Sequence, residues 1–175
     1  MIGKNEGGTA GMEYTVRPYK KGEEQYVAEA HRRIYREEYN WGPAFSEYAA
    51  AIALDFAKKE HGPGEELWVA EDTAAGRLLG CIMLCGAGDD TGQLRLFLVE
   101  PDCRRSGIGS ALTRVLFDRA REAGYRRLIL WTAGPLEDAV RIYGRLGFVQ
   151  TETSSNTDWS LAGEPVTEVK MELEL

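Results

Sequence analysis

The chain has 175 residues, of which 43% are hydrophobic and 28% charged, the composition of an ordinary globular domain with its own core. Acidic residues outnumber basic ones by 28 to 21, and this net charge of −7 argues against nucleic acid as a partner, because phosphate contacts need a basic face. No stretch approaches the roughly 20 apolar residues of a membrane helix, and the polar start lacks a secretory signal, so we expect a cytoplasmic protein with no membrane partner.

The first twelve residues are polar and rich in glycine. We therefore expect residues 1–12 to be disordered and residues 13–175 to form a single domain. The first predicted strand of that domain is short, covering residues 14–17, and Pro18 ends it.

Two helices are predicted next. Acidic residues follow Gly22 and favour a helix start, since the helix dipole stabilises negative charge in the first turn. Val27, Ala30 and Ile34 then recur at helical spacing and should form a buried face. The glycine and proline in residues 40–45 interrupt the pattern, and a second helix is predicted over about residues 47–59.

Three strands are predicted in the middle of the chain, at residues 67–70, 78–85 and 93–99. Their connections are too short for crossovers, so they should form an antiparallel meander.

The pattern then becomes helical, with apolar residues from Ile108 to Ala123 on one face and Gly124 at the expected C-cap. A strand, this helix and a strand at residues 128–131 form a crossover with parallel strands. The remaining predicted elements are a helix at residues 138–146 and strands at residues 148–153 and 166–175. The series predicts a mixed α/β (α+β) fold with a central sheet of about seven strands, a βαβ core and about four helices.

Cysteine and histidine usage exclude several kinds of site. Cys81, Cys85 and Cys103 leave one thiol unpaired in any disulfide scheme, which favours a reducing compartment. No Cys/His cluster suggests a metal, and the two histidines, His31 and His61, are far apart in sequence. We therefore expect no metal site and no Ser-His-Asp triad, and we interpret His31 as a helix-surface or satisfied core residue.

The informative run is LFLVEPDCRRSGIGSAL, residues 96–112. A buried strand ends in Val-Glu-Pro, and Gly107 and Gly109 stand at the start of the following helix. The first N–H groups of a helix have no intrahelical acceptor and attract anions, while glycines let a diphosphate approach the backbone. Arg104 and Arg105 add fixed cations. The run therefore predicts a diphosphate site.

Two better-known glycine loops do not fit this run. A dinucleotide fingerprint would have a third glycine where Leu112 stands and would place its glycines directly after the strand. A P-loop would need Gly-Lys followed by Ser or Thr, which the run lacks.

The pattern Arg104-x-x-Gly107-x-Gly109, continued by GYRRLILWT (124–132) and AVRIYGRLGF (139–148), resembles the coenzyme A loop and following signature of the GNAT superfamily of N-acetyltransferases. Residues 94–148 are similar, more narrowly, to the acetyltransferase domain fused to MarR-type regulators in some bacterial proteins. The resemblance implies an acetyl-CoA-dependent N-acetyltransferase without a metal, acting by direct attack of a primary amine, expected to belong to a small molecule.

The resemblance also implies residue roles. The backbone of Leu98 and Val99 would bind the pantetheine arm, and Tyr143 would be the general acid that protonates the leaving thiolate. The pyrophosphate would be held by Arg104, Arg105, Ser106, Gly107, Ile108, Gly109 and Ser110. One departure is Leu136, where many family members carry an asparagine that bonds the coenzyme.

Several alternatives remain open at this point. Arg104 or Arg105 could be a solvated loop charge, Tyr143 a core residue, and Cys103 is interpreted as incidental. The general base is not readable; Glu37, Glu38, Glu71, Asp89 and Glu100 are candidates by position, and Trp41, Phe45 and Tyr48 could line the acceptor pocket or belong to the core.

Three functional alternatives accompany the enzyme prediction. A coenzyme A-binding sensor without turnover is the main one; protein amines as acceptors also remain open, and the acidic charge disfavours acetylation of aminoacyl-tRNA. Many members of the family that the chain resembles pair through edge strands, and the alternating C-terminal strand could do the same and form a homodimer.

Overall fold

The computed structural model describes residues 12–39, 43–134, 136–156 and 165–175, so the segment predicted to be disordered lies almost wholly outside the described residues. Seven strands and four α-helices are present in the described part of the chain, as the sequence predicts. The strands are β1 (Tyr14–Pro18), β2 (Glu66–Asp72), β3 (Leu78–Gly86), β4 (Thr91–Val99), β5 (Arg127–Ala133), β6 (Val149–Asn156) and β7 (Val166–Glu174). The helices are α1 (Glu24–Tyr39), α2 (Pro43–Phe56), α3 (Ile108–Glu122) and α4 (Glu137–Arg145).

All seven strands join one mixed sheet in the order β1-β2-β3-β4-β5-β7-β6. The predicted meander is confirmed, because β2, β3 and β4 pair antiparallel in sequence order. The predicted crossover is confirmed too, since β5 pairs parallel to β4 after α3. The last strand, β7, inserts between β5 and β6. The suggestion that this strand offers a free edge for a homodimer is therefore wrong, because both of its edges are hydrogen-bonded.

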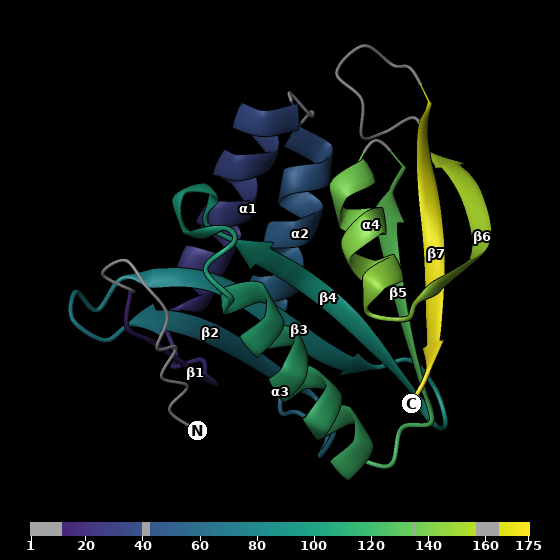
Figure 1. Ribbon diagram of the computed structural model, residues 1–175, viewed down its shortest axis with the longest axis horizontal. Helices are drawn as coiled ribbons and strands as arrows, with labels where there is room; N and C mark the ends of the chain where they lie inside the picture. Colours follow the sequence, from purple (N-terminus) through teal and green to yellow (C-terminus); the bar gives the residue numbers. More distant parts are fainter. Residues whose placement is uncertain (1–11, 40–42, 135, 157–164) are drawn as a thin grey trace.

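The helices cover both faces of the sheet (Figure 1). On one face, Val27 and Ile34 of α1 and Ala53 of α2 are buried against β2, β3 and β4. On the other face, Leu112 and Leu116 of α3 are buried against the opposite side of the same strands and of β5. Burial of apolar area on both faces is the main stabilising term of such a layered fold. Val27 and Ile34, the predicted core face of the first helix, are 0% and 3% exposed.

Several element boundaries differ from the sequence prediction. Helix α2 begins at Pro43 and not near Glu47, and it ends at Phe56. Proline suits the first turn of a helix, where its missing N–H has no intrahelical partner to lose, so the proline taken as a breaker is the helix start. A short 3₁₀ turn, Pro101–Cys103, also stands in what the sequence presents as a loop.

Strands β4 and β5 separate soon after they pair, and this separation positions the site. Only Thr91–Gln93 pair with Arg127–Ile129, although β4 continues to Val99 and β5 to Ala133. Figure 1 shows the two strands diverging, with β4 running toward α1 and α2 and β5 running alongside α4. On the side facing β5, the far half of β4 therefore pairs with no described strand, and its backbone groups there can bind a ligand.

Strand β4 also contains a β-bulge. Cys81 of β3 lies opposite Leu98, but Met83, two residues further along β3, lies opposite Arg95, three residues away on β4. The extra residue is accommodated at Leu96, whose φ of 50° is in the left-handed region. A bulge changes which face the side chains before it occupy, because side chains on a strand otherwise alternate strictly.

Candidate active site

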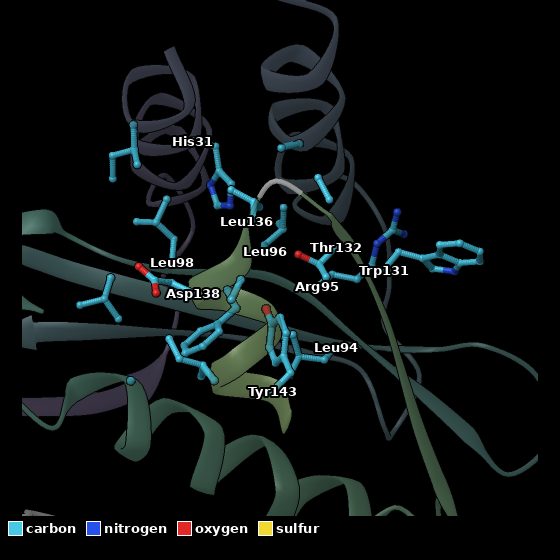
Figure 2. Close-up of a pocket in the computed structure, with 18 of the residues that line it drawn as sticks. His31, Leu94, Arg95, Leu96, Leu98, Trp131, Thr132, Leu136, Asp138 and Tyr143 are labelled. Atoms are coloured by element: carbon cyan, nitrogen blue, oxygen red, sulfur yellow. The ribbon is translucent and has the colours of Figure 1, made fainter. Parts of the chain in front are cut away.

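A cavity of about 1100 Å³ occupies the space where β4 and β5 diverge. Its walls come from β4 and β5, from α1 and α2 on one face of the sheet, and from α4 and the loop before α3 on the other. Figure 2 shows side chains from both faces pointing into it, with Tyr143 of α4 below and His31 of α1 above. The cavity therefore passes through the open seam of the sheet.

The loop before α3 forms an anion cradle at one end of this cavity. Arg105 has a φ of 63° and Gly107, the N-cap of α3, a φ of 88°. Left-handed residues next to a helix start turn successive N–H groups toward one side, an arrangement that binds anions. The N–H of Ala111 donates to Gly107, so the helical N–H groups before Ala111 have no partner inside the helix. The helix dipole adds positive potential at the same point.

The residues expected to hold coenzyme A are brought to this end, with two distinctions. The side chain or backbone of seven of them lines the cavity: Leu98, Val99, Arg104, Arg105, Gly107, Gly109 and Ser110. Ser106 does not line it, and its hydroxyl donates to the carbonyl of Cys103. Ile108 is 0% exposed, with its side chain in the core. Only the backbone of these last two can serve a ligand.

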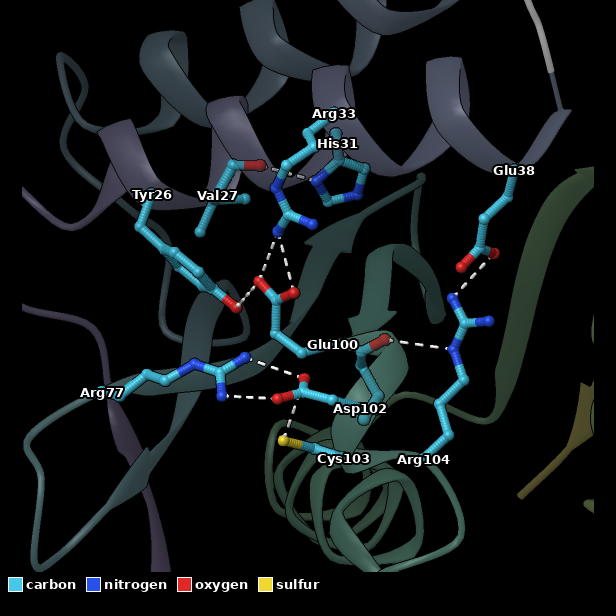
Figure 3. Close-up of polar contacts among 11 residues, drawn as sticks. Tyr26, Val27, His31, Arg33, Glu38, Arg77, Glu100, Asp102, Cys103 and Arg104 are labelled. Atoms are coloured by element: carbon cyan, nitrogen blue, oxygen red, sulfur yellow. Dashed lines mark hydrogen bonds and ion pairs between the residues drawn. The ribbon is translucent and has the colours of Figure 1, made fainter.

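Arg104 links the loop to α1. Its Nη2 lies 2.9 Å from Oε2 of Glu38, and its Nε donates to the carbonyl of Val99 over 3.4 Å (Figure 3). The guanidinium therefore stands beside the cavity with one carboxylate already attached. Its neighbour Arg105 lines the cavity as well and makes no ion pair within the described residues.

Two further ion pairs fix the loop from behind (Figure 3). The carboxylate of Glu100, whose side chain is 5% exposed, receives a 2.8 Å bond from Arg33 and a 3.0 Å bond from the hydroxyl of Tyr26. Arg77 pairs with Asp102 at 2.6 Å and holds the pKa of that carboxyl at about 2. A loop anchored on both flanks keeps its N–H groups oriented before a ligand arrives, which lowers the entropy lost on binding.

None of the five carboxylates considered as general bases lines the cavity. Glu71 pairs with Arg17, Glu100 with Arg33, and Glu38 with Arg104. Glu37 and Asp89 are exposed at the surface. They were candidates because of their position in the sequence. In the structure three of them form ion pairs, and none reaches the cavity between β4 and β5.

Tyr143 reaches the cavity from α4 and is 7% exposed. Its ring packs 6.2 Å from that of Phe97 and 5.9 Å from that of Phe148, measured between ring centroids. Its hydroxyl makes no hydrogen bond to any residue that the structure describes. Burial raises the pKa of Tyr143, so the phenol keeps its proton at neutral pH and can donate it.

His31 is a cavity residue that the sequence interpretation placed elsewhere. Its side chain is buried, at 2% exposure, and its Nδ1 lies 2.7 Å from the carbonyl of Val27. Because a carbonyl only accepts, Nδ1 carries the proton and Nε2 keeps its lone pair. Burial lowers the pKa of His31 to about 4, so the imidazole is neutral at pH 7. Its position four residues after Val27, on the apolar stripe of α1, was the available signal.

The other end of the cavity, which we call the acceptor end, is built largely from aromatic side chains. Phe45 and Tyr48 of α2 line it, as was considered from the sequence, while Trp41 lies outside the described residues. Trp131 of β5 belongs to the same aromatic lining, while Tyr35 and Tyr39 of α1 line the cavity beside Leu136 and close to Arg104.

Leu136, which replaces the expected asparagine, stands at the N-cap of α4 and makes no side-chain cap hydrogen bond. It is buried beside Tyr35 and Tyr39. The substitution therefore exchanges a polar group for an apolar contact that closes the cavity on this side.

Two other kinds of site are not present in the part of the chain that the structure covers. No three side chains of the types that bind metals lie together among the described residues. None of the described helices has the length and apolar character needed to span a membrane. Cys103 is buried with its thiol against Asp102 and does not line the cavity, consistent with an incidental role.

Comparison with known proteins identifies the family. Residues 25–148 match the Acetyltransferase (GNAT) family. Mycothiol acetyltransferase of Saccharomonospora viridis is 25% identical over 123 residues, which are 66% of this chain and 40% of that protein. The uncharacterized N-acetyltransferase YjgM of Escherichia coli is 32% identical over 89 residues, 49% of this chain and 52% of its own. The chain thus spans about half the length, or less, of these curated relatives.

A solved structure shares the fold. The protein yncA from Salmonella typhimurium, solved with its cofactor acetyl-CoA, superposes with a TM-score of 0.70 at 18% identity and covers 93% of this chain and 94% of its own. With the family match over most of the chain, the mixed seven-stranded sheet and the loop–helix cradle all in agreement, the chain belongs to the GNAT family of acetyltransferases.

Proposed function

We propose that this protein transfers the acetyl group of acetyl-CoA to the primary amine of a small molecule. One observation carries the proposal. A single cavity connects the anion cradle before α3, the unpaired edge of β4 and the hydroxyl of Tyr143. An acyl donor with a diphosphate at one end and a thioester at the other fits such a path.

The residues of this chain fit the coenzyme at three points. The N–H groups at the start of α3, with Arg104 and Arg105, would hold the pyrophosphate. The backbone of Leu98 and Val99, on the free edge of β4, would pair with the amides of the pantetheine arm as an added strand does. The bulge at Leu96 then lies where the arm would end, next to Phe97, whose ring packs against that of Tyr143.

The acyl donor supplies a thioester carbonyl, which the amine nitrogen attacks directly as the carbon–nitrogen bond forms and the carbon–sulfur bond breaks. Backbone N–H groups of β4 beside the bulge would polarise the carbonyl oxygen. The Tyr143 hydroxyl would give its proton to the departing sulfur. The phenol then regains a proton from solvent.

The proton released by the amine needs an acceptor. The neutral imidazole of His31 lines the cavity from α1, and its Nε2 makes no hydrogen bond within the described chain. We assign the acceptor role to this nitrogen, directly or through a water molecule. A neutral base also avoids repelling the positive charge that develops on the amine.

Turnover is the direct test. The purified protein is incubated with acetyl-CoA and a broad panel of primary amines, release of free coenzyme A thiol is followed, and the acetylated product is identified by mass spectrometry. Amine-dependent thiol release is the expected result. Stabilisation by acetyl-CoA with no turnover on any amine would instead support the sensor alternative, and neither binding nor turnover would contradict both.

Three narrower predictions stay predictions. They are the likeness to domains fused to MarR-type regulators, the cytoplasmic location and the homodimer. A homodimer formed by strand pairing would use β1 or β6, because these are the two edges of the described sheet.

A further inference from the structure

The acceptor end of the cavity contains an arginine that pairs with no carboxylate among the described residues. Arg95 of β4 donates from Nη2 to the hydroxyl of Tyr48 over 2.8 Å, and its guanidinium carbon lies 5.9 Å from the centre of the Tyr48 ring. No described carboxylate lies within ion-pair distance of it. By contrast, Arg17, Arg33 and Arg104 each pair with a carboxylate at 2.9 Å or less.

The β-bulge places Arg95 in the cavity. Leu98 and Leu96 lie on the α1/α2 face of the sheet, while Phe97 and Val99 lie on the α3 face, as strict alternation requires. Continued alternation would direct Arg95 to the α3 face, into the core. The extra residue of the bulge reverses the alternation, so Arg95 follows Leu96 on the α1/α2 face and reaches Tyr48 of α2.

The acidic side chains that line the cavity are engaged elsewhere. Asp138 pairs with Arg141 at 2.7 Å, and Glu168 accepts a 3.2 Å hydrogen bond from Ser154. Neither lies within 4.0 Å of the Arg95 guanidinium. The positive charge of Arg95 is therefore not neutralised by the part of the chain that the structure describes.

Aromatic side chains that are partly open to solvent surround Arg95. Tyr48 and Trp131 present aromatic surface at this end, with 51% and 39% of each residue exposed. Figure 2 shows Arg95 at the same end of the pocket as Trp131, away from Leu98 and Asp138. A guanidinium binds a carboxylate through two parallel hydrogen bonds.

We infer that the acceptor is a primary amine carrying a carboxylate, in the manner of an α-amino acid with an apolar or aromatic side chain, and that Arg95 binds that carboxylate. The inference rests on the proposed acetyl transfer and names its substrate class. Arg95 is adjacent to Leu96, at the bulge where the thioester would lie, so a carboxylate close to the amine matches the spacing. Tyr48 and Trp131 then offer the apolar surface for the side chain.

Matched acceptors isolate the carboxylate. The twenty common amino acids are assayed first, and the best of them are compared with amines that differ only in lacking the carboxylate, such as L-phenylalanine with 2-phenylethylamine and L-leucine with 3-methylbutylamine. L-Phenylalaninamide keeps the shape and removes the charge. The carboxylate should raise kcat/KM by about 10- to 100-fold, the usual value of a charged hydrogen bond, mainly through KM.

Variants assign the effect to Arg95. Arg95→Gln should bring the ratio of kcat/KM between a carboxylate and its counterpart close to one, and Arg95→Glu should reverse it. Arg114→Gln, at an exposed arginine of α3 outside the cavity, should keep the wild-type ratio. Amine acetylation without a carboxylate preference, or an equal loss for both members of a pair in Arg95→Gln, would overturn the inference and leave the proposed function standing.

Equilibrium dialysis of the labelled amino acid against the protein saturated with coenzyme A separates the two ideas. Binding that depends on Arg95, found without any turnover, would support recognition of the carboxylate by Arg95 while the proposed acetyl transfer fails. Absence of both turnover and binding for every carboxylated amine would overturn the inference.

Discussion

The two ends of the cavity recognise their ligands by different means. The coenzyme end comes from one continuous stretch, residues 98–110, and offers mainly backbone N–H groups at a helix start. The acceptor end is built from side chains on α1, α2, β4 and β5, which are distant in sequence. A backbone site constrains the sequence through glycines at fixed spacing, whereas a side-chain site leaves no such spacing. The first kind can be identified along the chain and the second only in three dimensions.

The largest effect is expected at the coenzyme end, from Gly109→Glu. A Cβ at this position would lie 3.4 Å from Phe97 and 3.7 Å from Val99, ordinary contacts, so the fold should persist. The added carboxylate would enter the anion cradle and repel the pyrophosphate. Acetyl-CoA binding should fall by more than about 100-fold. In thermal unfolding, a ligand at about 100 times its Kd adds roughly 2.7 kcal/mol, and this gain should vanish.

Gly109→Ala is the matched control, since it adds the same Cβ without charge. It should keep most of the stabilisation by acetyl-CoA. If acetyl-CoA stabilises Gly109→Glu as much as the wild type, the cradle does not hold the pyrophosphate. The coenzyme end would then not recognise its ligand through the backbone at the start of α3.

Tyr143→Phe should give the next largest effect, on chemistry alone. The hydroxyl makes no described hydrogen bond, so its loss leaves the packing against Phe97 and Phe148 in place. Removing a general acid typically costs about 100-fold or more in kcat. Steady-state kinetics with the best amine should show this fall while the Kd for acetyl-CoA changes little. An undiminished kcat would mean that water or another group, and not Tyr143, protonates the leaving thiolate.

The sequence predicted the fold to the extent that local patterns determine it. The apolar face of α3, Gly107 at its start and the short connections of the meander were sufficient for element types and for the parallel crossover. The start of α2 was misplaced, because Pro43 can either end one helix or begin another, and local sequence does not decide between these. The insertion of β7 between β5 and β6 depends on tertiary packing, and no local sequence pattern indicates it.

The residues of the candidate site also fall into two groups, those marked by a local pattern and those placed by tertiary structure. The cradle residues could be predicted from the sequence, because glycines and a helix start bind anions through the backbone and leave a local pattern. The position of Arg95 in the cavity could not be predicted from the sequence, since it depends on the bulge at the next residue. Strict alternation would have placed its side chain in the core. His31 carried a weak signal on the apolar stripe of α1, but only the divergence of β4 from β5 turns that stripe toward a cavity.

His31 offers a pH test that belongs to the acceptor end alone. Its pKa is about 4 in the folded protein and about 6.5 when unfolded, so the unfolded chain binds more protons between these values. Stability is therefore complete above about pH 6.5 and is lost as the pH falls toward 4. The contribution of this residue should be about 2 to 3 kcal/mol between pH 7 and 4.5.

Urea unfolding across that pH range should show the loss in the wild type and much less of it in His31→Asn, whose amide can still donate to Val27. His61→Asn, at an exposed histidine, should behave as the wild type does. Equal pH dependence in all three proteins would mean that the imidazole is not held in a neutral, buried state. His31→Asn should also lower kcat if Nε2 accepts the amine proton.

The smallest effect distinguishes two roles for Arg104, which belongs to the loop at the coenzyme end and pairs with Glu38 of α1. If it serves the pyrophosphate, Arg104→Gln should weaken acetyl-CoA binding by about fivefold to tenfold, and less so at high salt. Glu38→Gln should then strengthen binding slightly, by less than about fivefold, since the competing carboxylate is gone.

A structural link predicts something else. Arg104→Gln and Glu38→Gln would then lower the free energy of unfolding by the same small amount, and neither would change the Kd for acetyl-CoA. Calorimetric titration at two salt concentrations separates the two cases, with Arg105→Gln as the comparison, since Arg105 is a neighbouring cation that pairs with no described carboxylate. If Arg104→Gln weakens acetyl-CoA binding and Glu38→Gln strengthens it, the guanidinium binds the coenzyme. These opposite changes in affinity are expected only where Glu38 and the coenzyme compete for the same guanidinium.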